Sequence, residues 1–302
     1  DRRSRVLDTL LAIHGEQFTQ KSLQRFNHYH KAATNDWIIE NKINFLKCIK
    51  QTSRDRAKGV NYLRLSLNTE ESIQTEHSPG IHKKIGILLG LSRYNDAQLI
   101  SPVLTNRKSG LVTDRVFASR TNPLPQDQQS EAVPEPDHMH VDSNTITELP
   151  LFSHSIFKDG IDLENYRIVR SDQEAVVCIR TTQDGQLWPL TSKESFDEAV
   201  RYAQELCCKI TQLNMECENF HIIEHLLLRP RVCATHSSVK DQEAFYNFQV
   251  SVIFPSWTVR FADKNFRKFA EETVQSNLPA HIFPEFYWLD FVYMQDFEQR
   301  NG

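Results

Sequence analysis

Apolar residues in the N-terminal part of the chain recur every three or four positions, which is the spacing of one buried face of an α-helix. The pattern covers residues 6–18 and 37–49. It returns over residues 81–89, between a Ser-Pro-Gly helix-start signal and Gly90. Residues 1–120 are therefore predicted to form a mainly helical part.

The helical pattern stops in the next segment. Residues 121–150 contain recurrent prolines among Asp, Gln, Ser and Glu, with too few apolar residues to build a core. We therefore predict a proline-rich linker or arm over residues 121–160.

Residues 161–302 are predicted to combine strands and helices. Two short apolar runs, residues 166–169 and 175–180, predict strands of a small meander, and a helix is expected to follow Ser195. The same order recurs toward the C-terminus, where the pattern predicts strands over residues 245–254, 257–261 and 280–289 and helices over residues 263–276 and 290–300. The predicted fold class is α+β, with an N-terminal helical segment followed by a mixed strand-and-helix part.

Aromatic residues are concentrated near the C-terminus. Half of all the aromatic residues lie between Phe245 and Phe297. Two interpretations stay open: one compact aromatic core, or a core of which a part is an assembly surface, because aromatic residues are enriched at the centres of interfaces.

Composition and charge exclude several classes of protein. The net charge of -4 gives no general electrostatic reason for binding nucleic acid or anionic lipid. No apolar stretch approaches the roughly 18 to 20 residues that a membrane-spanning helix needs. The six cysteines include no C-x-x-C pair, which predicts free thiols in a reducing compartment. Hydrolase, kinase and Rossmann functions lack their usual motifs.

One string matches a metal-binding pattern. His221-Ile-Ile-Glu224-His225 fits the H-x-x-E-H pattern of inverted zinc peptidases. On a helix, His221 and His225 would lie one turn apart on one face, with Glu224 near enough to activate water. The third ligand has no recognisable motif among the downstream glutamates Glu243, Glu271 and Glu285. The alternative is a buried helix or strand whose histidines and glutamate make hydrogen bonds or ion pairs.

Other histidines and cysteines give weaker signals. Residues 137–142 carry His138 and His140 between two aspartates, which suits adventitious metal capture on a loop. Cys207 and Cys208 are neighbours on a predicted helix, so their side chains diverge by roughly 100 degrees. We expect them to be buried small residues rather than metal ligands.

Several phrases resemble a known family. They are Leu7-Asp-Thr-Leu-Leu-Ala-Ile-His-Gly-Glu-Gln-Phe18, Ser78-Pro-Gly-Ile-His-Lys-Lys-Ile-Gly-Ile-Leu-Leu-Gly-Leu91, Phe220-His-Ile-Ile-Glu-His-Leu-Leu-Leu-Arg-Pro230 and the C-terminal Phe254-Pro-Ser-Trp257, Arg260-Phe261, Tyr287-Trp-Leu289 and Phe297-Glu298. Together they resemble wedge-type baseplate components of phage-tail-like extracellular contractile injection systems. The resemblance touches most of the chain outside residues 92–160.

The resemblance implies assembly rather than turnover. It implies a structural baseplate subunit that links the central spike and hub to the sheath and rearranges on contraction, first in the bacterial cytoplasm and then in a released or anchored particle. The implied partners are other baseplate subunits and the sheath, tube and spike proteins of the same particle, without nucleic acid, cofactor or membrane span. No catalytic, cofactor-binding or metal-binding residue follows from it. A zinc-dependent hydrolase that uses His221, Glu224 and His225 remains the alternative.

Overall fold

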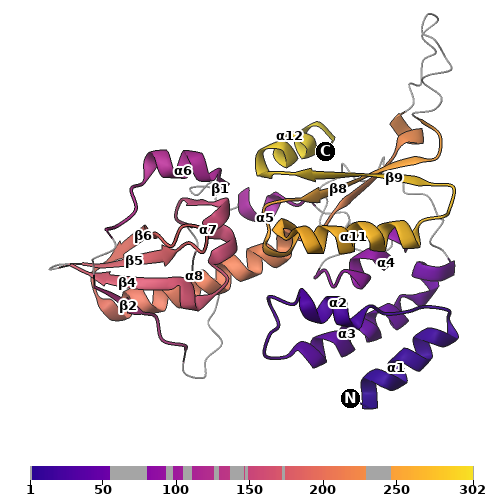
Figure 1. Cartoon of the computed structure of the whole chain (residues 1–302), viewed down its shortest axis with the longest axis horizontal. Coiled ribbons are helices and arrows are strands. Elements are labelled where there is room, and N and C mark those ends of the chain that lie inside the picture. The colour runs from indigo at the N-terminus through magenta and orange to yellow at the C-terminus, as the bar shows by residue number, and fades with distance from the viewer. Residues whose placement is uncertain are drawn as a thin grey trace, which may run out of the picture. The chain divides into compact units, whose positions relative to one another are not determined.

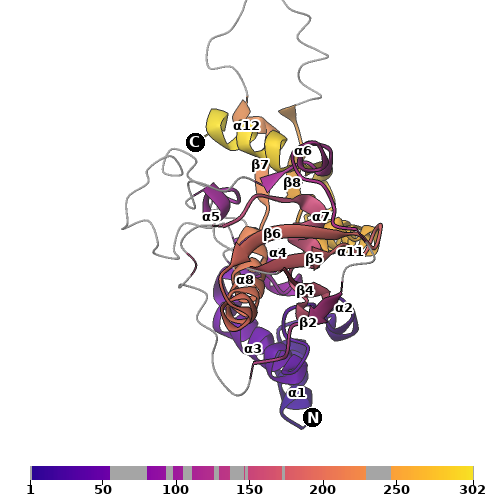
Figure 2. The ribbon, with the colours of Figure 1, turned by 90° about the vertical axis from the view of Figure 1, so that its left-hand side faces the viewer.

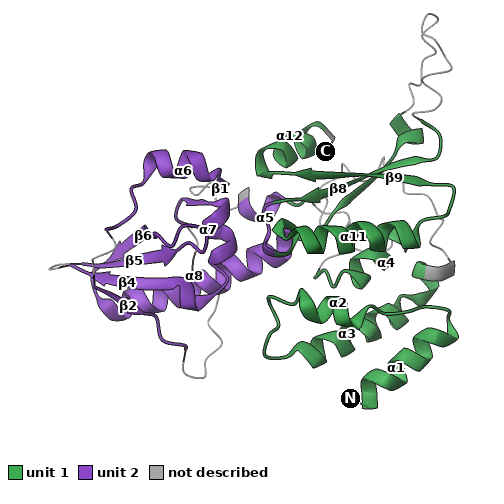
Figure 3. Cartoon of the chain, in the orientation of Figure 1, with its two compact units in different colours: residues 1–99, 218–256, 260–302 green, residues 100–217, 257–259 purple. Residues whose placement is uncertain are grey.

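The computed structural model has an α+β fold with helices at its N-terminus, as the sequence predicts. It divides into two compact units (Figure 3): unit 1 combines residues 1–99, 218–256 and 260–302, and unit 2 combines residues 100–217 and 257–259. The structure describes residues 2–54, 80–92, 98–104, 111–125, 129–136, 146, 149–171, 174–228 and 246–301.

The N-terminal helices of unit 1 include the three that the sequence predicts. They are α1 (Arg2–Ile13), α2 (Gln20–Arg25), α3 (Thr34–Lys47), a π-helical turn η1 (Lys50–Arg54) and α4 (Gly80–Leu88). Helix α1 packs on α3, and α4 packs on α3 and η1 (Figure 1). All the residues of α4 except Ile81 are buried, so this helix forms part of the interior of unit 1.

A three-stranded sheet forms the second half of unit 1. Its strands are β7 (His221–Glu224), β8 (Gln249–Pro255) and β9 (Phe283–Leu289), in the order β7-β8-β9. Strand β8 is antiparallel to β7 and parallel to β9. The chain passes between the two parallel strands through α10 (Val259–Ala262) and α11 (Lys264–Asn277), since a parallel pair needs a crossover. Helix α12 (Phe291–Asn301) follows β9.

The core of unit 1 lies between this sheet and the helices below it in Figure 1. Val250, Val252 and Phe254 face the same side of β8, because side chains alternate along a strand. They pack against Phe266, Ala270 and Val274 of α11 and against Ile85 and Leu89. Helix α12 lies on the opposite face of the sheet (Figures 1 and 2).

Unit 2 is a four-stranded antiparallel sheet covered on one face by a long helix. The sheet order is β2 (Ser130–Ala132), β4 (Tyr166–Arg170), β5 (Ala175–Arg180) and β6 (Leu187–Lys193). Helix α8 (Phe196–Cys217) places a stripe of buried residues on it: Ala199, Ala203, Leu206, Ile210 and Leu213. The predicted meander and the helix after Ser195 are both confirmed.

Shorter elements complete unit 2. They are α5 (Ser101–Leu104), β1 (Leu111–Val112), α6 (Asp114–Arg120), β3 (Phe152–Ser153), α7 (His154–Asp159) and the turn η4 (Leu163–Asn165). Strands β1 and β3 pair in parallel. No helix among the described residues is long and apolar enough to cross a membrane.

Two sequence predictions differ from the structure. The segment 121–160, predicted as a linker, supplies strand β2 and the buried residues Phe152 and Phe157, because a few well-placed apolar side chains suffice to join a core. The predicted strand over residues 257–261 is wrong, since α10 is helical. Its backbone N–H groups at Val259 and Arg260 donate to side-chain oxygens of Asn214 and Glu218, and these contacts override β-propensity.

The units also cross the predicted division into residues 1–120, 121–160 and 161–302. Unit 1 joins the N-terminal helices to the C-terminal sheet, and the residues between them form most of unit 2. The sequence pattern reports local periodicity and carries no information on which distant segments share a core.

Candidate functional site

The H-x-x-E-H string lies on a strand. His221, Ile222, Ile223 and Glu224 form β7, and His225 begins the turn η5 (His225–Leu228). The helical geometry expected for this string is therefore wrong. Because successive side chains on a strand point to opposite faces, Glu224 points away from the face that carries His221. The two β-branched isoleucines at its centre favour the strand.

His221 connects β7 to the last helix. Its Nε2 lies 2.9 Å from Oε1 of Glu298, which is 5% exposed on α12. The same carboxylate oxygen accepts the backbone N–H of Leu99 at 2.7 Å, and the ring of Phe297 lies beside the imidazole. His221 therefore helps to hold α12 on the sheet.

His225 has a different partner. Its Nε2 lies 2.7 Å from Oγ of Ser251 on β8, and its side chain is buried. The two histidines thus contact separate groups, as the hydrogen-bonding interpretation of the string predicts. Within the described residues, no group of three or more His, Cys, Asp or Glu side chains has a geometry that could hold a metal ion.

Two buried charges of unit 1 form a cluster that sequence reasoning missed. Arg260 donates through Nε to Glu218 at 2.6 Å and also pairs with it through Nη2, and both side chains are almost fully buried. Tyr29 donates its hydroxyl to the same carboxylate at 2.6 Å. Arg260 Nη1 donates to the carbonyls of Leu89 and Gly90 at 3.0 and 3.2 Å. The sequence feature that could have predicted this cluster is the single arginine inside the apolar run Trp257-Thr-Val-Arg-Phe261.

A second buried contact joins α4 to Phe220, the residue before β7. His82 Nε2 lies 2.7 Å from the carbonyl oxygen of Phe220, and the two rings stack at 4.2 Å. The next two side chains of α4 bind other segments: Lys83 donates to Gln51 of η1, and Lys84 pairs at 2.8 Å with Glu16, between α1 and α2. The polar residues of this buried helix therefore have specific partners on different segments.

Two partly buried histidines lie next to the arginine cluster. Burial lowers the pKa of His28 from its ordinary value; Glu218 and Asp263 oppose this effect, and Arg260 and Lys31 add to it. Burial also lowers the pKa of His30, with Arg260 adding to the effect and Glu40 opposing it. Both rings are therefore held toward the neutral form beside a buried guanidinium.

Three cysteines of unit 2 have raised pKa values. Burial raises the pKa of Cys178 and of Cys207 to about 12, and it raises the pKa of Cys208 as well. Because the thiolate is the nucleophile and metal ligand, these thiols are poorly suited to either role. The five described cysteines are free thiols, as predicted. Cys233 and the aspartate-flanked pair His138 and His140 lie outside the described residues.

The aromatic block divides into two sets. Phe254, Phe261, Phe266 and Trp288 contact one another in the core of unit 1. A second set is exposed on the surface, and it consists of Phe248, Phe283, Tyr287 and Tyr293. The C-terminal aromatic residues thus form a compact core, and further aromatic residues are exposed next to it. The structure is compatible with a core of which a part is an assembly surface.

Unit 1 is the candidate functional part, since the buried polar contacts of the quoted phrases lie in it. Glu218 binds Tyr29 and Arg260, and Glu298 binds His221 and the backbone N–H of Leu99. No protein-family model matches this chain, and no curated protein matches it either.

Proposed function

We propose that this protein is a non-catalytic structural subunit of a phage-tail-like contractile injection particle, and that it belongs to the baseplate. One observation carries the proposal. The phrases that resemble baseplate components are far apart in sequence, yet their polar residues bind one another inside unit 1. Arg260 of the C-terminal phrases binds the carbonyls of Leu89 and Gly90, and His82 binds that of Phe220.

The chemistry of these contacts supports a structural role. The side chains of His82, His221 and Arg260 each have a buried backbone or side-chain partner, and leaving such a partner unsatisfied would cost roughly 1 to 3 kcal/mol. Buried polar contacts are directional, so they favour one alignment of the segments over others. A subunit that transmits force between neighbours needs such a fixed interior.

The proposed role places the protein between the central spike and hub and the contractile sheath. Its partners would be other baseplate subunits and the sheath, tube and spike proteins, with several copies arranged by the symmetry of the particle. Rearrangement on contraction would occur at interfaces, because packed interiors have discrete rather than continuously deformable arrangements.

Gradient sedimentation of an untagged lysate from the native organism tests the proposal. We expect the chain to migrate in a multi-megadalton fraction, with sheath, tube and spike proteins identified there by mass spectrometry. A strain that lacks the sheath and tube genes is the control, and in its lysate the chain should move to lighter fractions. Migration as a small species in both lysates would contradict the proposal.

Metal analysis of the native protein addresses the hydrolase alternative. The hydrolase alternative would be supported if the native protein contained stoichiometric zinc and if His221→Ala lost both the zinc and an activity. The contacts of His221 with Glu298 and of His225 with Ser251 lead us to expect neither result.

A further inference from the structure

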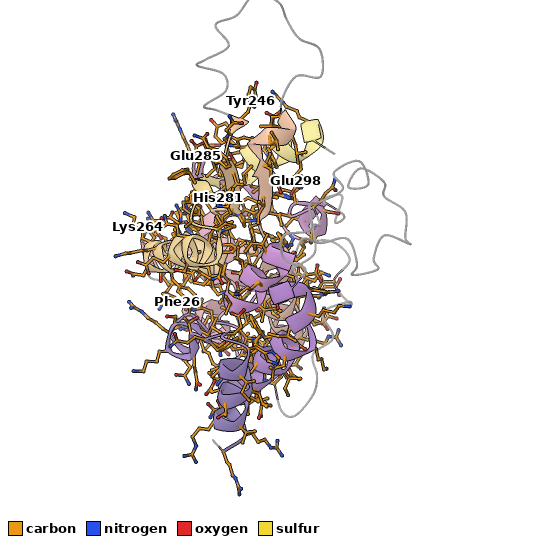
Figure 4. The ribbon with its side chains drawn as sticks, turned by 90° about the vertical axis from the view of Figure 1, so that its right-hand side faces the viewer. Phe26, Tyr246, Lys264, His281, Glu285 and Glu298 are labelled. Carbon is orange, nitrogen blue, oxygen red and sulfur yellow. The ribbon has the colours of Figure 1, made fainter. Side chains whose placement is uncertain are left out.

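The outer strand of the unit 1 sheet exposes an unusual row of side chains. On β9, Phe283 is 66% and Tyr287 44% exposed, and Glu285 between them is exposed as well. These three residues share one face of the strand because they alternate with Phe286 and Trp288, which pack against the core. Glu285 lies at the surface of the upper part of unit 1 in Figure 4.

The backbone of β9 has an unused side. The N–H of Phe283 donates to Phe248 and the carbonyl of Leu289 accepts from Ser256, each at 2.7 Å, so the odd-numbered residues pair toward β8. The even-numbered residues Pro284, Phe286 and Trp288 direct their backbone groups to the other side. In the described part of the chain, β8 is the only strand that pairs with β9.

The proline supports this assignment of the two sides. A proline cannot donate to a ladder, so it is found in strands whose N–H at that position faces away from the neighbouring strand. Pro284 occupies such a position on β9. The outer side therefore offers two donors, at Phe286 and Trp288, together with three carbonyl acceptors.

The exposed row also has an uncompensated charge. The hydroxyl of Tyr287 donates to Glu285 at 2.8 Å, and this bond raises the pKa of the tyrosine. No lysine or arginine among the described residues forms an ion pair with Glu285. An arginine placed there would meet a carboxylate and two aromatic rings, which attract a guanidinium through their faces.

We propose that β9 is the docking edge for an extended segment of another protein, which adds a fourth strand to the sheet. The segment has a basic residue opposite Glu285 and apolar residues two positions to either side, opposite Phe283 and Tyr287. Backbone bonds to the free edge supply affinity, and the alternating side chains supply specificity. This inference depends on the sheet alone, so its test is independent of the baseplate proposal.

A second copy of this chain is the less suitable occupant. In a two-fold antiparallel pairing of two β9 strands centred on Glu285, the two carboxylates would lie directly opposite each other. Like charges at such positions are destabilising. The charge on β9 therefore disfavours this register of self-pairing and favours a partner of opposite charge.

Peptides with alternating residues provide the test. The first probe is Thr-Val-Thr-Arg-Thr-Val-Thr, and the second has Glu in place of Arg. Binding to the full chain is measured by fluorescence anisotropy, and amide hydrogen exchange of Phe286 and Trp288 is followed by NMR. We expect the Arg peptide to bind at least about fivefold more tightly than the Glu peptide and to protect both amides.

A charge reversal supplies the discriminating variant. Glu285→Lys should reverse the preference between the two peptides, and it should keep the fold because the side chain is exposed. Glu272→Lys on α11 is the matched control, since that carboxylate is 63% exposed and pairs only weakly with Lys268 at 3.9 Å. It should leave the peptide preference unchanged.

Three outcomes would overturn the inference. The first is equal affinity for the two peptides, and the second is an unchanged preference in Glu285→Lys. The third is self-association of Glu285→Ala, detected by sedimentation velocity, without any peptide-induced protection of Phe286 and Trp288. That result would show that Glu285 prevents edge-to-edge pairing of two chains, and that a second copy rather than another protein binds to β9.

Discussion

Arg260 and Glu218 illustrate at the residue scale how this protein accommodates charge in its interior. The pair is completed by Tyr29 and by the carbonyls of Leu89 and Gly90, so nearly every polar atom has a partner. Such a pair contributes little net stability when it is compared with apolar residues of the same shape. Separating the pair would cost free energy, because a buried charge would lose its partner. This cost favours one arrangement of the three segments of unit 1.

Removing either charge alone should therefore be costly. We expect Arg260→Met and Glu218→Gln each to lower the free energy of unfolding by about 3 to 5 kcal/mol, because each leaves a buried charge unpaired. The double variant should lose less than the sum of the two. Urea denaturation measures these values. Arg300→Met is the control, since its exposed pair with Asp296 is worth about 0 to 1 kcal/mol.

The histidines beside this cluster make stability depend on pH. The pKa values of His28 and His30 are lowered in the folded state, mainly by burial, so folding favours their neutral forms. Their contribution to stability is present in full above the unfolded pKa of 6.5 and is lost as the pH falls through the lower folded values.

The expected result is a decrease in the urea midpoint between pH 7.5 and pH 5, and it should be smaller in the double variant His28→Gln/His30→Gln. His14→Gln, at an exposed position, is the control and should keep the original dependence. A dependence that is the same in all three proteins would show that other groups control it.

At the scale of elements, the end of α4 depends on one glycine. Gly90 has a φ of +64° just after the helix, where glycine is favoured. A Cβ at this position would lie 2.7 Å from two ring atoms of Trp37 and 3.0 Å from Leu23. Both the backbone conformation and the close approach of α2 and α3 therefore require glycine.

A matched pair of substitutions separates these two causes. Gly15 has a similar φ of +73°, and nothing lies within 4 Å of a Cβ there. We expect Gly15→Ala to cost roughly 1 to 2 kcal/mol from the backbone alone. Gly90→Ala should cost about 1 to 3 kcal/mol more, from overpacking against Trp37. Equal losses in the two variants, measured by urea denaturation, would contradict the packing argument.

Local periodicity predicted most of the elements and little of their arrangement. The helices α11 and α12 follow from apolar spacing, and the strands β4 and β5 follow from short apolar runs. The string from His221 to His225 shows the limit, because its histidine spacing fits a helix while its isoleucines fit a strand. The partners Glu298 and Ser251, which are 77 and 26 residues away, settle the outcome and leave no local trace in the sequence.

At the scale of the whole molecule, each of the two units has its own core and contains two of the four tryptophans. Trp37 and Trp288 lie in unit 1, and Trp188 and Trp257 in unit 2. Pairs of Trp→Phe substitutions can therefore leave fluorescence reporters in one unit only. This arrangement allows the stability of each unit to be measured within the full chain.

We expect Gly90→Ala to lower the urea midpoint of the unit 1 reporters by about 1 M, given typical dependences of stability on urea. The midpoint of the unit 2 reporters should stay unchanged. The same shift in both reporters would show that the two units unfold as one.

The discontinuous course of unit 1 has a consequence for its synthesis. Residues 100–217 leave the ribosome before any strand of the unit 1 sheet exists. At roughly 5 to 20 residues per second, the interval between Leu89 and Val250 lasts about 8 to 30 s, during which the strand that packs against α4 has not yet been made. Glu298, which binds both His221 and the backbone N–H of Leu99, follows β9 and emerges later still. Unit 1 thus begins before unit 2 and is completed only after it.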